Sequence, residues 1–195
     1  MAEKPCGLIA MIPPALEAEW AARLEELIKP FKPAALIIQA PQTAAPACLI
    51  EKAKPLALAV LFADAAEAAH KTGASGVYFS LDAANISDAR RTLGGESIIG
   101  AACGLSRHAA MESAEAGADF IAFDASAPEN LDEAAELSSW WDEITGVPAA
   151  LFFGKSRPDP SYLEKAHPDF LILEEAGRAG ESLTFATEFG LQSQS

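Results

Sequence analysis

The sequence is poor in basic residues. Its 195 residues hold 14 lysines and arginines against 28 aspartates and glutamates, and the formal net charge is −14. Nucleic-acid binding depends on basic side chains that neutralise phosphates, so we expect no nucleic-acid partner. A small phosphorylated ligand would need a local basic group or a helix N-terminus to hold it.

Cysteine and long apolar runs are also scarce. The three cysteines are Cys6, Cys48 and Cys103; they form no CxxC pair and no zinc-binding spacing. This usage is typical of a reduced compartment, and we expect a cytoplasmic protein. No apolar run approaches the roughly 20 residues that span a bilayer, so we expect no membrane partner. The first apolar segment, GLIAMI, is too short for a secretory signal and predicts a strand.

Short apolar runs alternate with longer alanine-rich segments along the whole chain. The runs are almost continuously apolar, which is typical of parallel strands that are buried on both faces. Eight strands are predicted, at Gly7–Ile12, Ala34–Ala40, Leu56–Phe62, Gly76–Leu81, Ser97–Cys103, Asp119–Ala125, Pro148–Gly154 and Asp169–Glu175. Helices are predicted at Leu16–Ile28, Ala45–Lys52, Asp64–Lys71, Ser87–Leu93, Ser106–Ala116, Leu131–Ile144, Pro160–Ala166 and Leu183–Phe189.

Eight strand–helix units predict an α/β fold, a compact single-domain (βα)8 TIM barrel over residues 1–195. The alternative is an open doubly wound sheet. It is less favoured because eight strand signals are present and no GxGxxG turn follows the first strand. A weak internal repeat supports the barrel. The joints before every second strand resemble one another: FKPAALII, TGASGVYF, AGADFIAF and AHPDFLIL.

The chemistry of such barrels lies at the carboxyl ends of the strands. The polar and reactive residues at these ends are Gln39, Asp64, Ser80, Asp82, Cys103, Ser106, Asp124, Ser126, Lys155, Ser156, Arg157, Glu174 and Glu175. Several have a purely structural interpretation. Asp64 and Ser106 suit helix N-caps, Cys103 suits a small buried apolar position, and Asp124 suits the cap of the loop that follows it. Lys155 as the Schiff-base lysine of a barrel lyase or aldolase is a remote alternative.

One stretch of the chain resembles a known family. It contains Ala63-Asp64 after the third strand, and then GASGVYFS, IIGAA and GADFIAF in the same order and spacing as the family pattern. The segment from Leu56 to Phe123 resembles the thiamine phosphate synthases, whose family includes the TenI-type thiazole tautomerases. The resemblance implies a small (βα)8 barrel, a homodimer, and a transferase that joins a pyrimidine pyrophosphate to a thiazole phosphate.

The resemblance also implies roles for single positions. Asp64 and Asp82 would bind Mg²⁺, which is needed only if the protein is catalytic. Tyr78 stands where the family has the histidine of the pyrimidine pocket. Gly154 and Lys155 would contact a phosphate. Gln39 replaces a basic residue, SAPENLDEA replaces a Thr-x-Thr-Lys segment, and Glu174 lies where a phosphate would receive backbone donors.

These departures lead to two hypotheses. The first is a divergent thiamine phosphate synthase-like protein with much reduced activity on the thiamine precursors. The alternative is a non-catalytic relative that binds a neutral or cationic small molecule at an acidic mouth formed by Asp64, Asp82, Asp124, Glu174 and Glu175. A homodimer is expected, and the adjacent Trp140 and Trp141 cannot share one helix face, so one of them is free for a subunit contact.

Overall fold

The strands close into a barrel. The computed structural model of the protein describes residues 6–39, 45–80, 85–157 and 159–186. Each strand pairs in parallel with its neighbour in sequence, and β8 pairs with β1. The strands are β1 (Gly7–Ile12), β2 (Ala35–Ile38), β3 (Ala59–Ala63), β4 (Gly76–Phe79), β5 (Ile98–Gly104), β6 (Phe120–Asp124), β7 (Ala149–Gly154) and β8 (Phe170–Glu174). The predicted (βα)8 barrel is confirmed, and the open sheet is wrong.

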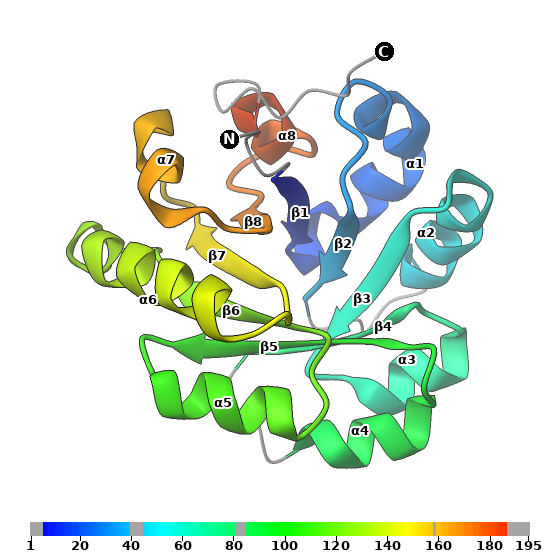
Figure 1. Cartoon of the computed structure of the whole chain (residues 1–195). Helices are drawn as coiled ribbons and strands as arrows, with labels where there is room; N and C mark the ends of the chain where they lie inside the picture. The colour runs from blue at the N-terminus through cyan, green and yellow to red at the C-terminus, as the bar shows by residue number, and fades with distance from the viewer. Residues whose placement is uncertain (1–5, 40–44, 81–84, 158, 187–195) are drawn as a thin grey trace.

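Helices surround the barrel on the outside (Figure 1). They are α1 (Glu17–Ile28), α2 (Ala45–Ala53), α3 (Ala66–Thr72), α4 (Ile86–Leu93), α5 (Arg107–Glu115), α6 (Leu131–Ile144), α7 (Leu163–Ala166) and α8 (Glu181–Ala186). Within the described part of the chain, none of them is both long enough and apolar enough to cross a membrane.

The strand predictions differ most at β3, which begins at Ala59 and not at Leu56. Lys54–Leu56 forms a 3-10 turn with proline near its start, and Ala57 ends it in the left-handed conformation at φ 52°. A proline has no N–H for a strand ladder, so the apolar run joins the sheet later than its composition indicates. The predicted cap at Asp64 is also wrong: Ala65 precedes α3 and no side chain caps that helix. Ser106 does cap α5, since its hydroxyl accepts the Ala109 N–H at 3.2 Å.

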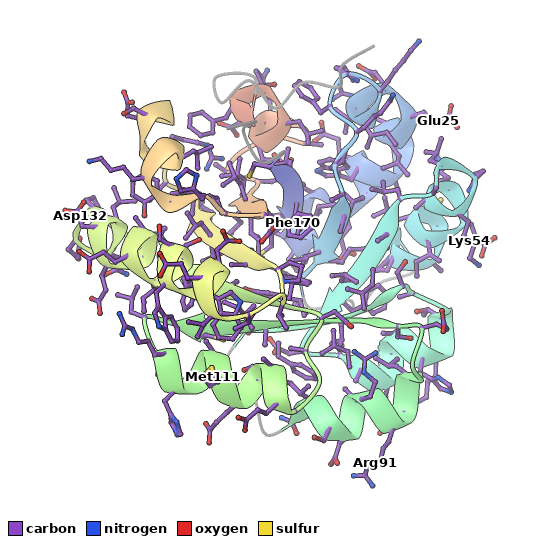
Figure 2. All side chains as sticks on the ribbon, in the orientation of Figure 1. Glu25, Lys54, Arg91, Met111, Asp132 and Phe170 are labelled. Carbon is purple, nitrogen blue, oxygen red and sulfur yellow. The ribbon has the colours of Figure 1, made fainter. Side chains whose placement is uncertain are left out.

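The inside of the barrel is filled by alternate strand residues. Tyr78 stacks on Phe120 with ring centroids 6.0 Å apart, and Phe120 meets Phe170 edge to face at 6.2 Å. Figure 2 shows Phe170 inside the ring of strands. A glycine makes room for these rings: a Cβ at Gly100 would lie 2.1 Å from the Phe120 ring. The interior is therefore a packed core beneath the strand ends and not a channel.

A second core lies between the strands and the helices. Trp141 is fully buried there, and its indole N–H donates to the Val147 carbonyl at 2.8 Å. Its neighbour Trp140 is half-buried, with the Arg107 guanidinium 4.6 Å from its ring centroid. The prediction that the two tryptophans face different ways is confirmed.

The repeated joints at the bottom of the barrel share one hydrogen-bond pattern. The residue before each even-numbered strand donates its N–H to a carbonyl of the preceding strand at 2.7 to 2.8 Å; these residues are Ala34, Ser75, Asp119 and Asp169. In three of the four, the side chain also accepts the N–H of the same partner, namely Val60, Ile99 and Ala149. The sequence repeat therefore reflects a repeated tie between neighbouring strands.

Candidate functional site

The mouth of the barrel lies at the carboxyl ends of the strands. Side chains alternate along a strand, and β2, β6 and β8 direct their interior residues inward. The same alternation directs Gln39, Asp124 and Glu174 toward the barrel axis at the mouth. All three are half-buried. The structure thus brings together three of the predicted ligand-binding residues.

Gln39 contacts β1 across the mouth. Its amide Nε2 lies 3.0 Å from the sulfur of Met11, an interior residue with 4% of its surface exposed. A thioether sulfur is a weak acceptor, so this contact holds the glutamine loosely. Gln39 therefore presents a neutral amide to the mouth.

Asp64 ties the end of β3 to the end of β4. It adopts the left-handed conformation at φ 52°, and its N–H donates to the Tyr78 carbonyl at 2.9 Å. One carboxylate oxygen accepts the Ser80 N–H at 2.9 Å, and the other accepts the Ser80 hydroxyl. Asp82, the other predicted magnesium ligand, lies outside the described residues. Among the residues that are described, no three histidine, cysteine or acidic side chains gather as a metal-binding group.

Asp124 caps the loop that follows β6, as its structural interpretation predicts. One carboxylate oxygen accepts the Ser126 N–H at 2.9 Å, and the other accepts the Asn130 amide at 3.1 Å. Both oxygens keep lone pairs that can face a ligand. Asp124 can therefore be a cap and a ligand contact at the same time.

The loop after β7 carries two basic residues, Lys155 and Arg157, that already have partners at the ends of β7 and β8. Lys155 Nζ lies 3.3 Å from Glu174 Oε1; the lysine side chain is 60% exposed and the glutamate 18%. Arg157 donates to the carbonyls of Gly154, Ser156 and Glu174. Burial lowers the pKa of Arg157, and the surrounding carboxylates act in the opposite direction.

Glu175 does not face the mouth. It is completely buried beneath α8, where its carboxylate accepts hydrogen bonds from Gly180 and Ser182. Burial raises the pKa of this carboxyl, and the hydrogen bonds counteract the shift. The acidic mouth proposed for the alternative hypothesis therefore lacks Glu175, because residues 174 and 175 project to opposite sides of the strand.

Tyr78 and Cys103 lie on opposite sides of the barrel wall. The Tyr78 ring is inside and 2% exposed, and its hydroxyl has no hydrogen-bond partner among the described residues. Burial raises the pKa of Tyr78, and Cys103, Asp64 and Asp124 add to the shift. The Cys103 sulfur is in the outer core, 3.7 Å from the Ser113 hydroxyl, and burial raises its pKa too. Cys103 is thus separated from the residues of the mouth.

Comparison with known proteins places this geometry in a family. The family model for thiamine monophosphate synthase matches residues 17–145. The chain belongs to the thiamine monophosphate synthase family. The match contains β2 to β6; β1, β7 and β8 lie outside it. Relatives in this family include the thiamine-phosphate synthase of Erythrobacter litoralis, 34% identical over 136 residues, which are 66% of this chain and 64% of that protein.

A second relative shows a similar identity and a similar coverage. The thiamine-phosphate synthase of Rhodospirillum centenum is 32% identical over 133 residues, which cover 64% of this chain and 64% of that protein. The matched region thus spans less than two thirds of both relatives. Solved structures agree on the fold: thiamine phosphate pyrophosphorylase from Pyrococcus furiosus has a TM-score of 0.74 at 18% identity, over 97% of this chain and 95% of that chain.

The same barrel occurs in other enzymes. A 3-dehydroquinate dehydratase from Geobacillus kaustophilus reaches a TM-score of 0.69 at 13% identity, over 96% of this chain and 90% of that chain. Barrel geometry alone therefore does not distinguish this family's chemistry from others. The residues of the mouth have to carry the functional argument.

Three side chains that contact the strand-end residues were not predicted from the sequence. Met11 lies under Gln39, Asn130 donates to Asp124, and Ser182 donates to Glu175. The contact of Asn130 could have been predicted, because Asn130 stands just before a predicted helix and six residues after Asp124. Ser182 had the same kind of signal, since it precedes the predicted helix Leu183–Phe189 and lies seven residues after Glu175. Met11 had none, because it lies 28 residues before Gln39 in the sequence.

Proposed function

We propose that this chain is a divergent thiamine phosphate synthase-like protein with much reduced activity on the pyrimidine pyrophosphate and the thiazole phosphate. The family match supports the substrate class. The residues of the mouth differ from the family pattern, and these differences support the loss of activity. A family member with weakened activity accounts for both the match and the differences.

One observation carries the proposal: the cations near the end of β7 are already engaged within the chain. Lys155 pairs with Glu174, and Arg157 binds three backbone carbonyls. The synthase reaction separates a pyrimidine cation from pyrophosphate, so negative charge develops on the departing group. Free, preorganised positive charge is needed there. These two side chains would have to leave their present partners to supply it.

The loop after β2 does not replace the missing charge. The segment after β2, QAPQTA (residues 39–44), contains no lysine or arginine. Loss of one preorganised contact to developing charge lowers the rate by about 10² to 10³. The effects of several such losses are not additive, but they act in the same direction.

Magnesium belongs to this proposal only if catalysis occurs. The carboxylate oxygens of Asp64 already accept from Ser80, and each can accept one more contact, so this residue can supply one ligand. Asp82 would supply the second. The ion would neutralise the pyrophosphate, while Asp64 would keep the ends of β3 and β4 joined.

The test is a direct assay. Purified protein is mixed with the pyrimidine pyrophosphate, the thiazole phosphate and Mg²⁺, and thiamine phosphate is followed with time. We expect a rate far below that of ordinary enzymes. Turnover of about 1 s⁻¹ or faster would overturn the proposal.

A second candidate is the non-catalytic relative, which binds a neutral or cationic small molecule. Among the described residues the Tyr78 hydroxyl has no hydrogen-bond partner, and Asp64 and Asp124 lie near it, which favours a ligand that offers a hydrogen bond or a positive charge. The unphosphorylated pyrimidine and thiazole are the probes to use in thermal shift measurements. This candidate predicts that they raise the Tm more than their phosphorylated forms do, and that Tyr78→Phe reduces the effect. A larger shift with the phosphorylated forms would contradict it.

A further inference from the structure

The layer of interior side chains just below the mouth is filled unevenly. It lies beneath Gln39, Asp124 and Glu174 and comes from the odd-numbered strands; its members are Met11, Ala63, Ala102 and Phe152. Ala63 on β3 and Ala102 on β5 contribute only methyl groups. Both are half-buried, so solvent reaches them from the mouth. The two alanines therefore border a hollow that is open to the mouth.

Tyr78 forms the floor of this hollow. It lies on β4 between the two alanines, since it pairs with Ala63 on one side and with Gly100, two residues before Ala102, on the other. Its side chain is only 2% exposed, and its hydroxyl has no hydrogen-bond partner among the described residues. A buried polar group without a partner costs free energy, and an N–H group of a ligand in the hollow would satisfy it.

Phe152 supplies an aromatic wall on the opposite side. Its ring packs against the interior core and is half-buried. The ring reaches up to Gly154, because a Cβ on that glycine would lie 3.5 Å from the Cζ atom of Phe152. Asp124 pairs with Phe152 in the register of β6 and β7, so a carboxylate stands beside the ring. An aromatic face next to a carboxylate attracts a flat cation.

The described charges at the mouth have a negative balance. Asp64, Asp124 and Glu174 are acidic, and Lys155 and Arg157 are basic. Lys155 pairs with Glu174 at 3.3 Å, and Arg157 binds three backbone carbonyls. The electrostatic influence of Asp64 and Asp124 extends to the Tyr78 hydroxyl. A monocation in the hollow would balance the excess negative charge, whereas a phosphate would add to it.

We propose that the mouth binds a flat, unphosphorylated organic monocation, with its ring against Phe152 and its N–H groups toward Tyr78 and Asp124. The edge of the ring lies over the methyl groups of Ala63 and Ala102. This inference deepens the second candidate function and rests on it, because both require an unphosphorylated ligand. It goes further in requiring both the positive charge and the flat ring.

Titration calorimetry with three probes tests the ligand class. Benzamidinium is a flat cation, benzamide has nearly the same shape without the charge, and guanidinium has the charge without the ring. We expect benzamidinium to bind roughly tenfold more tightly than either of the other two. Equal affinities for benzamidinium and benzamide would overturn the inference and leave the second candidate function standing, since that candidate accepts neutral ligands. No binding of benzamidinium at millimolar concentration would also overturn the inference.

Amide NMR of the wild-type protein locates the bound probe. Benzamidinium is titrated at constant ionic strength, with the amide signals of Ala63 and Ala102 as readout. Saturable shifts of both signals support the inference. Saturable binding that leaves both signals in place would overturn it, because the cation would then lie outside the hollow.

Variants test the cause. Tyr78→Phe removes the hydroxyl and should weaken benzamidinium binding by about threefold to tenfold. Ala102→Leu fills the hollow and should abolish the binding. Ala34→Leu makes the same change at an exposed position at the opposite end of the barrel, so it is the control and should bind like the wild type. If Ala102→Leu does not fold, Tyr78→Phe decides alone, and an unchanged affinity in that variant would overturn the inference.

Discussion

Glu174→Gln is the sharpest test of the electrostatic argument at the mouth. Glu174 faces the barrel axis, is 18% exposed and pairs with Lys155 at 3.3 Å. The substitution removes one negative charge, keeps the shape of the side chain and frees the lysine for another anion. We expect inorganic pyrophosphate to bind the variant more tightly than the wild type.

The size of the effect follows from the geometry. A phosphate on the free side of the Lys155 ammonium would place its phosphorus about 6 Å from the Glu174 carboxylate. Two unit charges at that separation repel by about 3 kcal/mol at an effective dielectric of 20 and by about 0.7 kcal/mol in water. The dissociation constant should therefore fall between roughly threefold and hundredfold.

Titration calorimetry at low ionic strength measures this change. Glu115→Gln, which alters the net charge equally on the far end of α5, should leave the affinity unchanged. Added salt should reduce the difference between Glu174→Gln and the wild type, because mobile ions screen the repulsion. Equal affinities of the wild type and Glu174→Gln at low salt would refute the reasoning, provided that both proteins melt at similar temperatures.

Three further predictions concern stability, assembly and reactivity. Asp119→Ala leaves a strand N–H of β5 without its acceptor and breaks an ion pair, so urea unfolding should show a loss of about 1 to 3 kcal/mol. The protein should sediment as a homodimer at micromolar concentration, and Ile144→Glu, at an exposed position beside Trp140, should shift it toward monomer. Burial raises the pKa of the Cys103 thiol, so at pH 8 it should react with a thiol reagent far more slowly than the exposed Cys48.

Each of these has a matched comparison and a contrary outcome. The control for Asp119→Ala is Glu115→Ala, which should unfold like the wild type. An equal loss of unfolding free energy in both variants would show that the hydrogen bond from β5 to Asp119 is not the cause. Leu56→Glu, at an exposed position far from α6, should not change the mass in solution. A monomeric wild type would contradict the dimer. Fast reaction of Cys103 in the folded protein would show that α5 does not cover it.

The sequence by itself determined the architecture. Eight apolar runs, each followed by a helical segment, left few topologies other than a closed barrel, and the β1 and α6 boundaries match their predictions. The repeat before the even-numbered strands was also visible, and in three of its four copies a polar residue stands where the joint bonds to the preceding strand. These properties follow from local periodicity and burial, which a single sequence records directly.

The sequence indicated the caps at Ser106 and Asp124, whereas tertiary structure alone decided what Asp64, Glu174 and Glu175 do. Asp64 could cap a helix or face a ligand, and its bonds to Ser80 arise from the closure of β3 on β4. Glu174 and Glu175 are adjacent and chemically alike in the sequence. Strand alternation places the first in the mouth and the second beneath α8, where donors seven residues away in the chain meet it. A carboxylate's role depends on the partners that folding brings to it, and neither spacing nor composition encodes those partners.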